Sequence, residues 1–220
     1  RRDLEKLEKQ EVIWKVHGGA RLRTPLMGRE VPVSIRQEMS TEEKIAVARK
    51  CLEYIRHNDV LMLDNSTTVL CLARELKATE LKLTVITNSL SILNELSAVP
   101  NIELISPGGA LNAETNGFSS GFAIEAIDKF HAGKCFISSS GISAKFGLTD
   151  HYESEALIRR KMLLNSDKRY FISDSSKIEK KMVYVVGGID MLDCVIIDKP
   201  APAQFVDHLR QSKVSFVSCK

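Results

Sequence analysis

The chain has 220 residues, of which 44% are hydrophobic and 27% are charged, a composition that is ordinary for a globular protein with one main core. The formal net charge of +3 is too small to indicate nucleic-acid binding by itself. No apolar run reaches the roughly 18 residues of a membrane-spanning helix, and the basic N-terminus leads into no apolar signal core, so we expect a soluble cytoplasmic protein.

The first segment, RRDLEKLEKQEVIWKVHGGARLR, begins without methionine and is typical of the end of a longer domain. Leu4 and Leu7 lie three residues apart among charged residues, as they do in the tail of an amphipathic helix. VIWKV, the Gly18-Gly19 turn and ARLR then predict a small hairpin. A helix followed by a basic hairpin is the second half of a winged helix, but a solvated helix beside an incidental hairpin explains these residues about equally well.

The following residues predict a linker and then a regular alternation of strands and helices. No periodic pattern is present from Pro25 to Arg36, and we assign 25–39 as a linker. Ser40 and Glu43 form a capping box that predicts the start of a helix with one apolar face. Strands are predicted at 60–64, 82–87, 102–106, 133–138, 168–173, 183–186 and 193–197, and helices at 67–77, 89–97, 119–130, 153–165 and 202–211. This alternation predicts an α/β fold, with a mostly parallel, Rossmann-like sheet flanked by helices.

Polar residues cluster directly after five of the predicted strands. The clusters are Asp64 to Thr68, Asn88-Ser89, Gly108-Gly109, Ser138 to Gly141 and Asp174 to Lys177. Any one of the four that hold Ser, Thr, Asn or Asp is also explained by helix capping, because these are the preferred N-cap residues. Since parallel strands end at a shared edge of the sheet, where ligands bind in this fold class, the five clusters together favour a pocket.

The residue types at this edge fit a phosphorylated sugar. Hydroxyls and N–H groups at the start of a helix bind anions, and Lys177 adds a full positive charge. Asp64 and Glu155 can accept hydrogen bonds from sugar hydroxyls. Neither GxxxxGK[ST] nor GxGxxG is present, so a triphosphate or a dinucleotide is poorly supported and we expect no cofactor. The five scattered cysteines, without CxxC spacing or nearby histidines, predict buried apolar side chains and no metal site.

Over nearly its whole length the sequence resembles the DeoR-type bacterial transcriptional regulators. RRDLEKLEKQEVIWKVHGGA is similar to the end of that family's winged helix-turn-helix, and LDNSTTVLCLAREL is similar to its L-D-x-G-T-T segment. VITNS, PGG, SSSGIS, GLTDHYESEALIRRKM and SDSSK follow in the family's order. The resemblance implies a repressor of sugar metabolism with a ribose-5-phosphate isomerase and CoA-transferase-like fold. Its parts would be the end of a truncated winged helix-turn-helix at 1–24, a linker at 25–39 and a sugar-phosphate effector-binding domain at 40–220.

By position, the resemblance also implies binding residues and partners. The effector pocket would be lined by Asp64, Ser66, Thr67, Thr68, Asn88, Gly109, Ser140, Gly141, Glu155 and Lys177. Operator DNA would be contacted by Arg1, Arg2, Lys15, His17 and Arg21. Because helix-turn-helix repressors usually bind paired half-sites, we expect a homo-oligomer, either a dimer or a tetramer.

Two departures from the family pattern bear on the function. Asn65-Ser66 stands where the family usually has a small residue and glycine, which changes how the backbone approaches a phosphate. Ser140 and Ser143 stand where related isomerases carry aspartates, so the chain lacks a carboxylate base there. We therefore predict that the protein is not an enzyme. The alternative is a sugar-phosphate isomerase or a CoA-transferase-like enzyme of the same fold, which a turnover assay on pentose and hexose phosphates would detect.

Overall fold

The computed structural model describes residues 4–5, 13–16, 19–22, 31 and 33–219. Strand β1 (Ile13–Val16) pairs antiparallel with β2 (Gly19–Leu22), which confirms the predicted hairpin. Leu4 and Glu5 are helical, and the rest of the predicted N-terminal helix lies outside the described residues.

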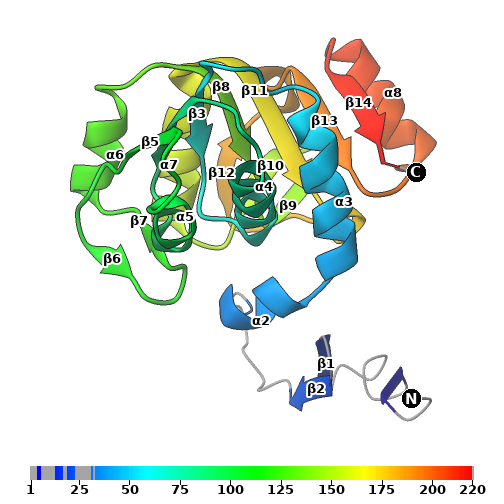
Figure 1. Ribbon diagram of the computed structural model, residues 1–220. Helices are drawn as coiled ribbons and strands as arrows, with labels where there is room; N and C mark the ends of the chain where they lie inside the picture. Colours follow the sequence, from blue (N-terminus) through cyan, green and yellow to red (C-terminus); the bar gives the residue numbers. More distant parts are fainter. Residues whose placement is uncertain (1–3, 6–12, 17–18, 23–30, 32, 220) are drawn as a thin grey trace.

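A seven-stranded sheet forms the centre of the molecule, with the strand order β14-β13-β11-β8-β3-β4-β5 (Figure 1). Each neighbouring pair is parallel, which confirms the predicted α/β class and the parallel sheet. The strands are β3 (Val60–Leu63), β4 (Leu83–Thr87), β5 (Ile102–Ile105), β8 (Ala132–Ile137), β11 (Ser166–Ser173), β13 (Cys194–Ile197) and β14 (Ser215–Ser218). The edge strand β14 was not predicted, because its short SFVS sequence alternates serines with apolar residues and carries little signal.

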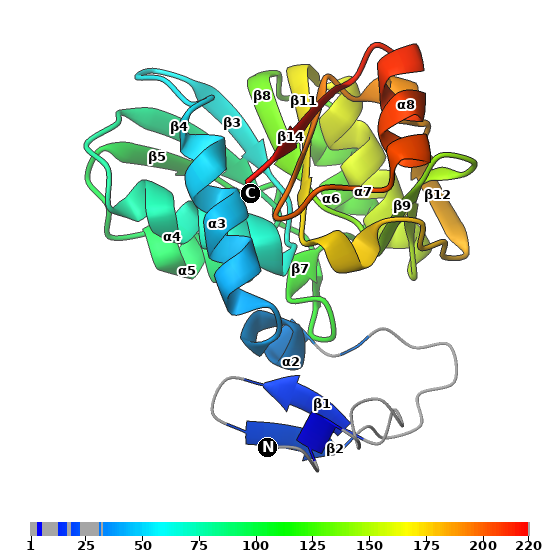
Figure 2. The same cartoon turned by 90° about the vertical axis from the view of Figure 1, so that its right-hand side faces the viewer.

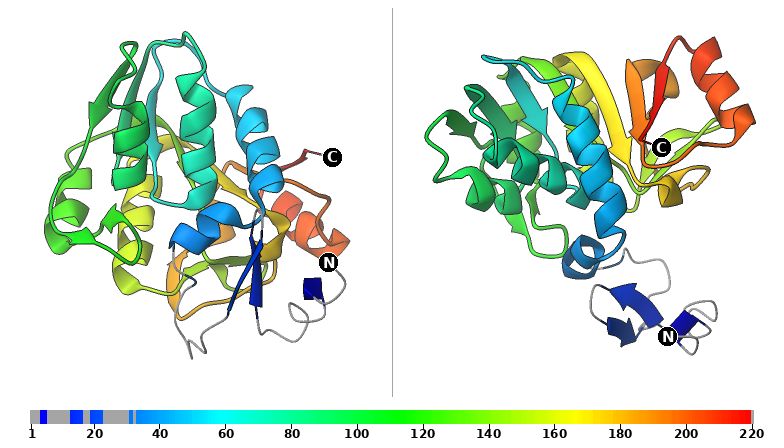
Figure 3. Two further views of the ribbon diagram at one scale, coloured as in Figure 1. Left: turned by 60° about the horizontal axis from the view of Figure 1, so that its bottom comes forward. Right: turned by 45° about the vertical axis from the view of Figure 1, so that its right-hand side comes forward.

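Helices cover both faces of this sheet (Figure 2; Figure 3, right). They are α3 (Thr41–Leu52), α4 (Thr67–Lys77), α5 (Leu90–Leu96), α6 (Gly121–Ile127), α7 (Glu153–Leu164) and α8 (Ala203–Gln211). Successive strand residues point to opposite faces, so Leu61 and Leu63 pack in the cluster with α3, α4 and α5, while Met62 packs in the cluster with α6, α7 and α8. In the part of the chain that the structure describes, no helix combines the length and apolar character needed to span a membrane.

A second, antiparallel sheet lies apart from the central one, with the strand order β12-β10-β9. It is built from β9 (Gly141–Ser143), β10 (Gly147–Asp150) and β12 (Tyr184–Gly187). The strand predicted at 183–186 is therefore present, but its assignment to the main sheet is wrong, because β12 pairs with β10. A further small hairpin joins β6 (Leu111–Asn112) to β7 (Gly117–Phe118).

The segment before α3 differs most from the prediction. Helix α2 (Val33–Glu38) lies within the part predicted to be an irregular linker (Figure 3). Ser40, between α2 and α3, has a left-handed backbone with φ of 49°, and its side chain makes no capping hydrogen bond. The predicted capping box is therefore wrong. The joint is instead held by Lys44, which is buried and donates from Nζ to the carbonyl oxygens of Arg36 and Met39.

Candidate functional site

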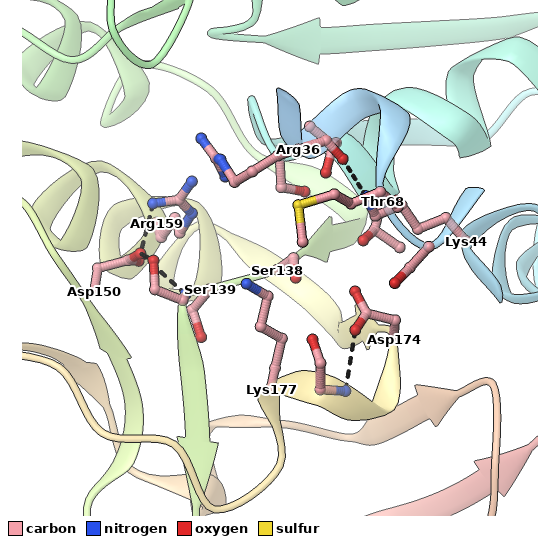
Figure 4. A pocket seen from close by; sticks show the side chains of 15 residues that line it. Arg36, Lys44, Thr68, Ser138, Ser139, Asp150, Arg159, Asp174 and Lys177 are labelled. Carbon is pink, nitrogen blue, oxygen red and sulfur yellow. Dashed lines mark hydrogen bonds and ion pairs between the residues drawn. The ribbon is translucent and has the colours of Figure 1, made fainter. Parts of the chain in front are cut away.

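A pocket opens at the carboxyl ends of β3, β8 and β11, between α2 and the 3-10 helix η1 (Ser175–Lys177) (Figure 4). The residues that line it are Arg36, Met39, Ser40, Lys44, Ser66, Thr67, Thr68, Ser138, Ser139, Ser140, Asp150, Arg159, Asp174, Ser176 and Lys177. Met39 is the one apolar side chain in this set, and hydroxyls and charges supply the rest. Such a lining suits a polar ligand that makes many hydrogen bonds.

The start of α4 forms one wall of the pocket. Ser66 is the N-cap residue: its backbone is extended, and its Oγ accepts a hydrogen bond from the N–H of Val69 at 3.3 Å. Thr67 and Thr68 follow as the first helical residues, and N–H groups in a first turn have no acceptor within the helix. Because these donors lie at the positive end of the helix dipole, this wall favours an anionic group.

The opposite wall contains a buried ion cluster centred on Arg159 of α7. Its Nε lies 2.7 Å from Asp64 Oδ2, its Nη1 lies 2.9 Å from Asp150 Oδ2, and its Nη2 lies 3.2 Å from Glu155 Oε2. Nη2 also donates to Asn65 Oδ1 at 2.9 Å. Burial alone would lower the pKa of Arg159, but the surrounding carboxylates outweigh it and raise that pKa above its ordinary value. Arg159 is therefore a permanent cation at the site.

Asp64 and Glu155, the two carboxylates predicted to accept hydrogen bonds from sugar hydroxyls, do not line the pocket. Asp64 has no exposed surface, and it accepts hydrogen bonds from the N–H of Ser66 at 3.1 Å and of Ser138 at 3.2 Å, besides pairing with Arg159. Glu155 is also buried beside the guanidinium. Both carboxylates are buried where they pair with Arg159. Asp150 is the carboxylate of this cluster that lines the pocket.

Among the other predicted effector residues, the structure brings Ser66, Thr67, Thr68, Ser140 and Lys177 together in the pocket. Asn88, Gly109 and Gly141 are not part of its lining. The buried Asn88 donates from Nδ2 to the carbonyl oxygen of Phe118 at 3.3 Å and so holds the hairpin of β7. Gly109 has φ of +99°, a turn conformation that suits glycine.

The predicted DNA-binding residues belong to the N-terminal segment. Lys15 lies on β1 and Arg21 on β2, while Arg1, Arg2 and His17 lie outside the described residues.

Sequence reasoning missed Arg36, Lys44, Asp150 and Arg159. A usable signal existed for Lys44, because Val47, Ala48 and Cys51 follow it at spacings of three, four and seven residues, so that Lys44 shares the buried face of α3. A similar signal existed for Arg159, which shares the buried face of α7 with Ala156, Met162 and Leu163. A charged residue on a buried helical face needs polar partners, and here both Lys44 and Arg159 line the pocket.

Lys44 lines the pocket and has charges of both signs near it. Burial lowers its pKa to about 8; the carboxylate of Asp174 opposes this change, and the positive charges of Lys177 and Arg36 add to it. Asp174 itself accepts from the N–H of Ser176 at 3.0 Å, which fixes the turn that carries Lys177. Figure 4 shows Lys177 extending into the pocket from this turn.

Two protein-family models match the chain. The model described as "DeoR C terminal sensor domain" matches residues 39–199, and the model described as "DeoR-like helix-turn-helix domain" matches residues 1–25.

Curated proteins are similar to the chain along nearly its whole length. The uncharacterized HTH-type transcriptional regulator YulB of Bacillus subtilis (strain 168) is 33% identical over 214 residues, which cover 97% of this chain and 82% of that protein. The HTH-type transcriptional repressor GlcR of the same strain is 32% identical, over 99% of this chain and 83% of its own. The glycerol-3-phosphate regulon repressor of Escherichia coli (strain K12) is 29% identical, over 100% of this chain and 86% of its own.

Solved structures show a more distant likeness. Ribose 5-phosphate isomerase A from Methanocaldococcus jannaschii aligns with a TM-score of 0.47 and 15% identity, over 63% of this chain and 54% of the isomerase. The eIF2B delta subunit from Chaetomium thermophilum aligns with a TM-score of 0.48 and 12% identity, over 68% of this chain and 57% of that subunit. The chain thus spans little more than half of each of these proteins.

Proposed function

Because the chain belongs to the DeoR family of transcriptional regulators, we propose that residues 40–220 bind a phosphorylated sugar and transmit its presence to the DNA-binding part of the protein. The curated relatives are regulators and repressors, so the protein acts as a regulator and not as an enzyme. The observation that carries the proposal is that the first residues of α4, Thr67 and Thr68, line the same polar pocket as Lys177.

The phosphate is assigned to the side of the pocket formed by α4 and η1. There Thr67 and Thr68, the first residues of α4, line the same pocket as Lys177. Backbone donors at a helix start bind an oxyanion, and a hydrogen bond to a charged group contributes about 1.5–3 kcal/mol. Together they favour a phosphate over a neutral group.

The sugar is assigned to the side formed by the loop after β8. Ser138, Ser139 and Ser140 line the pocket there, next to Asp150 and Arg159. Hydroxyls, a carboxylate and a guanidinium supply both donors and acceptors, which is what the hydroxyl groups of a sugar require. One relative is named as the repressor of a glycerol-3-phosphate regulon. Glycerol 3-phosphate, like a sugar phosphate, combines a phosphate group with hydroxyl groups.

The DNA-binding role is assigned to the N-terminal segment. Residues 1–25 match the helix-turn-helix model, and Lys15 and Arg21 lie on the two strands of a hairpin. With Arg1, Arg2 and His17 they would contact the phosphate backbone, which fixes register without reading sequence. The protein would bind operator DNA as a homo-oligomer, because paired half-sites call for two-fold symmetry.

Native mass spectrometry against a panel of phosphorylated sugars, each with its unphosphorylated counterpart, tests the proposal. We expect saturable binding of one phosphorylated sugar or a closely related group of them, and much weaker binding of the free sugars. Binding of free sugars alone, or of none of the phosphorylated compounds, would refute it.

A further inference from the structure

One residue that lines the pocket comes from outside both family matches. Helix α2 (Val33–Glu38) lies between the helix-turn-helix match, which ends at residue 25, and the sensor match, which begins at residue 39. Arg36 of this helix nevertheless lines the pocket. Figure 4 shows its side chain reaching into the pocket on the side opposite Lys177.

We propose that Arg36 binds the anionic effector and that α2 is the element through which an occupied pocket acts on the DNA-binding part. The inference rests on the proposed function, because it takes the pocket to be the effector site. It adds a binding residue and a route of regulation.

The contacts of α2 connect both of its ends to cations of the pocket. Arg36 donates from Nε to the carbonyl oxygen of Val31 at 2.9 Å, so its side chain is tied to the residues just before the helix. At the other end, Lys44 donates from Nζ to the carbonyl oxygens of Arg36 and Met39. Through these hydrogen bonds, a displacement of the Arg36 or Lys44 side chain would shift the backbone of α2, and a shift of α2 would displace the two side chains.

The charges of the pocket lining make α2 sensitive to an anion. Arg36, Lys44, Arg159 and Lys177 supply four positive charges, and Asp150 and Asp174 supply two negative charges. The positive charges of Lys177 and Arg36 act against the protonated form of Lys44. A bound phosphate would relieve this repulsion, and a guanidinium such as that of Arg36 binds phosphate well, in a two-pronged geometry.

The size of α2 explains why such a contact would change its order. The helix has six residues, and a helix this short has little stability of its own in water. Ile35 is buried, while Val33, Arg36, Gln37 and Glu38 are only half-buried, so the order of α2 depends on its contacts with the rest of the domain. A ligand shifts an equilibrium only by the difference in its affinity for the two states, and Arg36 would provide that difference.

The test uses the 220-residue chain with inorganic phosphate as the probe, and it measures two quantities. Calorimetric titration gives the affinity, and amide hydrogen exchange gives the protection of residues 33–39 with and without phosphate. The variants are Arg36→Ala and Arg36→Lys. The control is Arg49→Ala, which removes the same charge from an exposed ion pair with Glu75 on α3 and α4.

We expect phosphate to slow exchange at residues 33–39 at least fivefold in the parent. Arg36→Ala should weaken phosphate binding about tenfold and abolish that protection, Arg36→Lys should retain part of both, and Arg49→Ala should match the parent. If Arg36→Ala binds phosphate and protects α2 like the parent, the inference is wrong while the proposed function stands. If the parent binds neither phosphate nor any phosphorylated sugar, both are wrong.

Discussion

The guanidinium of Arg159 lies 2.7 Å from the carboxylate of Asp64, measured from Nε to Oδ2, and the two residues are 95 positions apart in the chain. The contact joins α7 to the end of β3, and both side chains are buried. Asp64 in turn accepts hydrogen bonds from the N–H of Ser66, the N-cap residue of α4, and from the N–H of Ser138, which begins the loop after β8. The buried pair of Asp64 and Arg159 thus fixes the start of α4 and the loop after β8 relative to α7.

Arg159→Met should lower the free energy of unfolding by about 3–5 kcal/mol, because it leaves the carboxylates of Asp64, Asp150 and Glu155 buried without their cation. Urea denaturation followed by circular dichroism measures the change. The control Arg49→Met disrupts an exposed pair with Glu75 and should cost less than about 1 kcal/mol. Equal losses in the two variants would show that the buried cluster has no special role in stability.

Ser66→Ala and Thr67→Val should separate capping from ligand binding. The first variant removes the acceptor for the N–H of Val69 and should lower the free energy of unfolding by about 1 kcal/mol. The second replaces a hydroxyl that lines the pocket and should leave stability nearly unchanged while it weakens binding of the sugar phosphate several-fold. Thermal melting and titration of both variants check this, and a Thr67→Val protein with parental affinity would remove Thr67 from the binding set.

The affinity for the sugar phosphate should fall as the pH rises through about 8. Burial lowers the pKa of Lys44 to about 8, and a bound anion favours the protonated lysine, so binding raises that pKa. Above pH 8 the free protein has lost this proton and must take it up on binding, which costs affinity. The phosphate itself, with a second pKa of about 6, is already fully ionised there.

Calorimetry at pH 8.5 in buffers of different ionisation enthalpy measures that proton uptake. Lys44→Met should abolish it and make the affinity nearly independent of pH between 7 and 9. Proton uptake that persists unchanged in Lys44→Met would assign the effect to another group.

The periodicity of the sequence predicted most of the central sheet because local pattern determines it. Buried strands such as β3 are continuous apolar runs and are therefore easy to recognise. Polar residues that follow these strands, including Ser66 and Lys177, were expected to lie close together because parallel strands end at one edge of the sheet, and both line the pocket. The strand at 183–186 was recognised but placed in the wrong sheet, since pairing with β10 depends on a contact between distant segments that no local pattern encodes.

The parts of the site that were missed depend on tertiary contacts. Asp64 was expected to face a sugar, but it is fully buried, pairs with Arg159 from another element and does not line the pocket. Ser40 was expected to cap α3, but Lys44 holds the joint to α2 and Ser40 adopts a left-handed backbone. Both cases involve a buried cation, and a sequence pattern shows the cation without the groups to which it donates.

Lys177→Ala gives the most direct test that the pocket binds the phosphate of its ligand. The measurement is a calorimetric titration of the parent and the variant with the best-binding sugar phosphate and with the same sugar lacking its phosphate, with Lys168→Ala as a control that removes an exposed lysine paired with Asp193. We predict that Lys177→Ala weakens binding of the sugar phosphate about 10- to 100-fold and that Lys168→Ala binds it like the parent. The free sugar should bind the parent no more tightly than the sugar phosphate binds Lys177→Ala. A free sugar that binds as tightly as its phosphate, or a Lys177→Ala protein with parental affinity, would contradict the anion site.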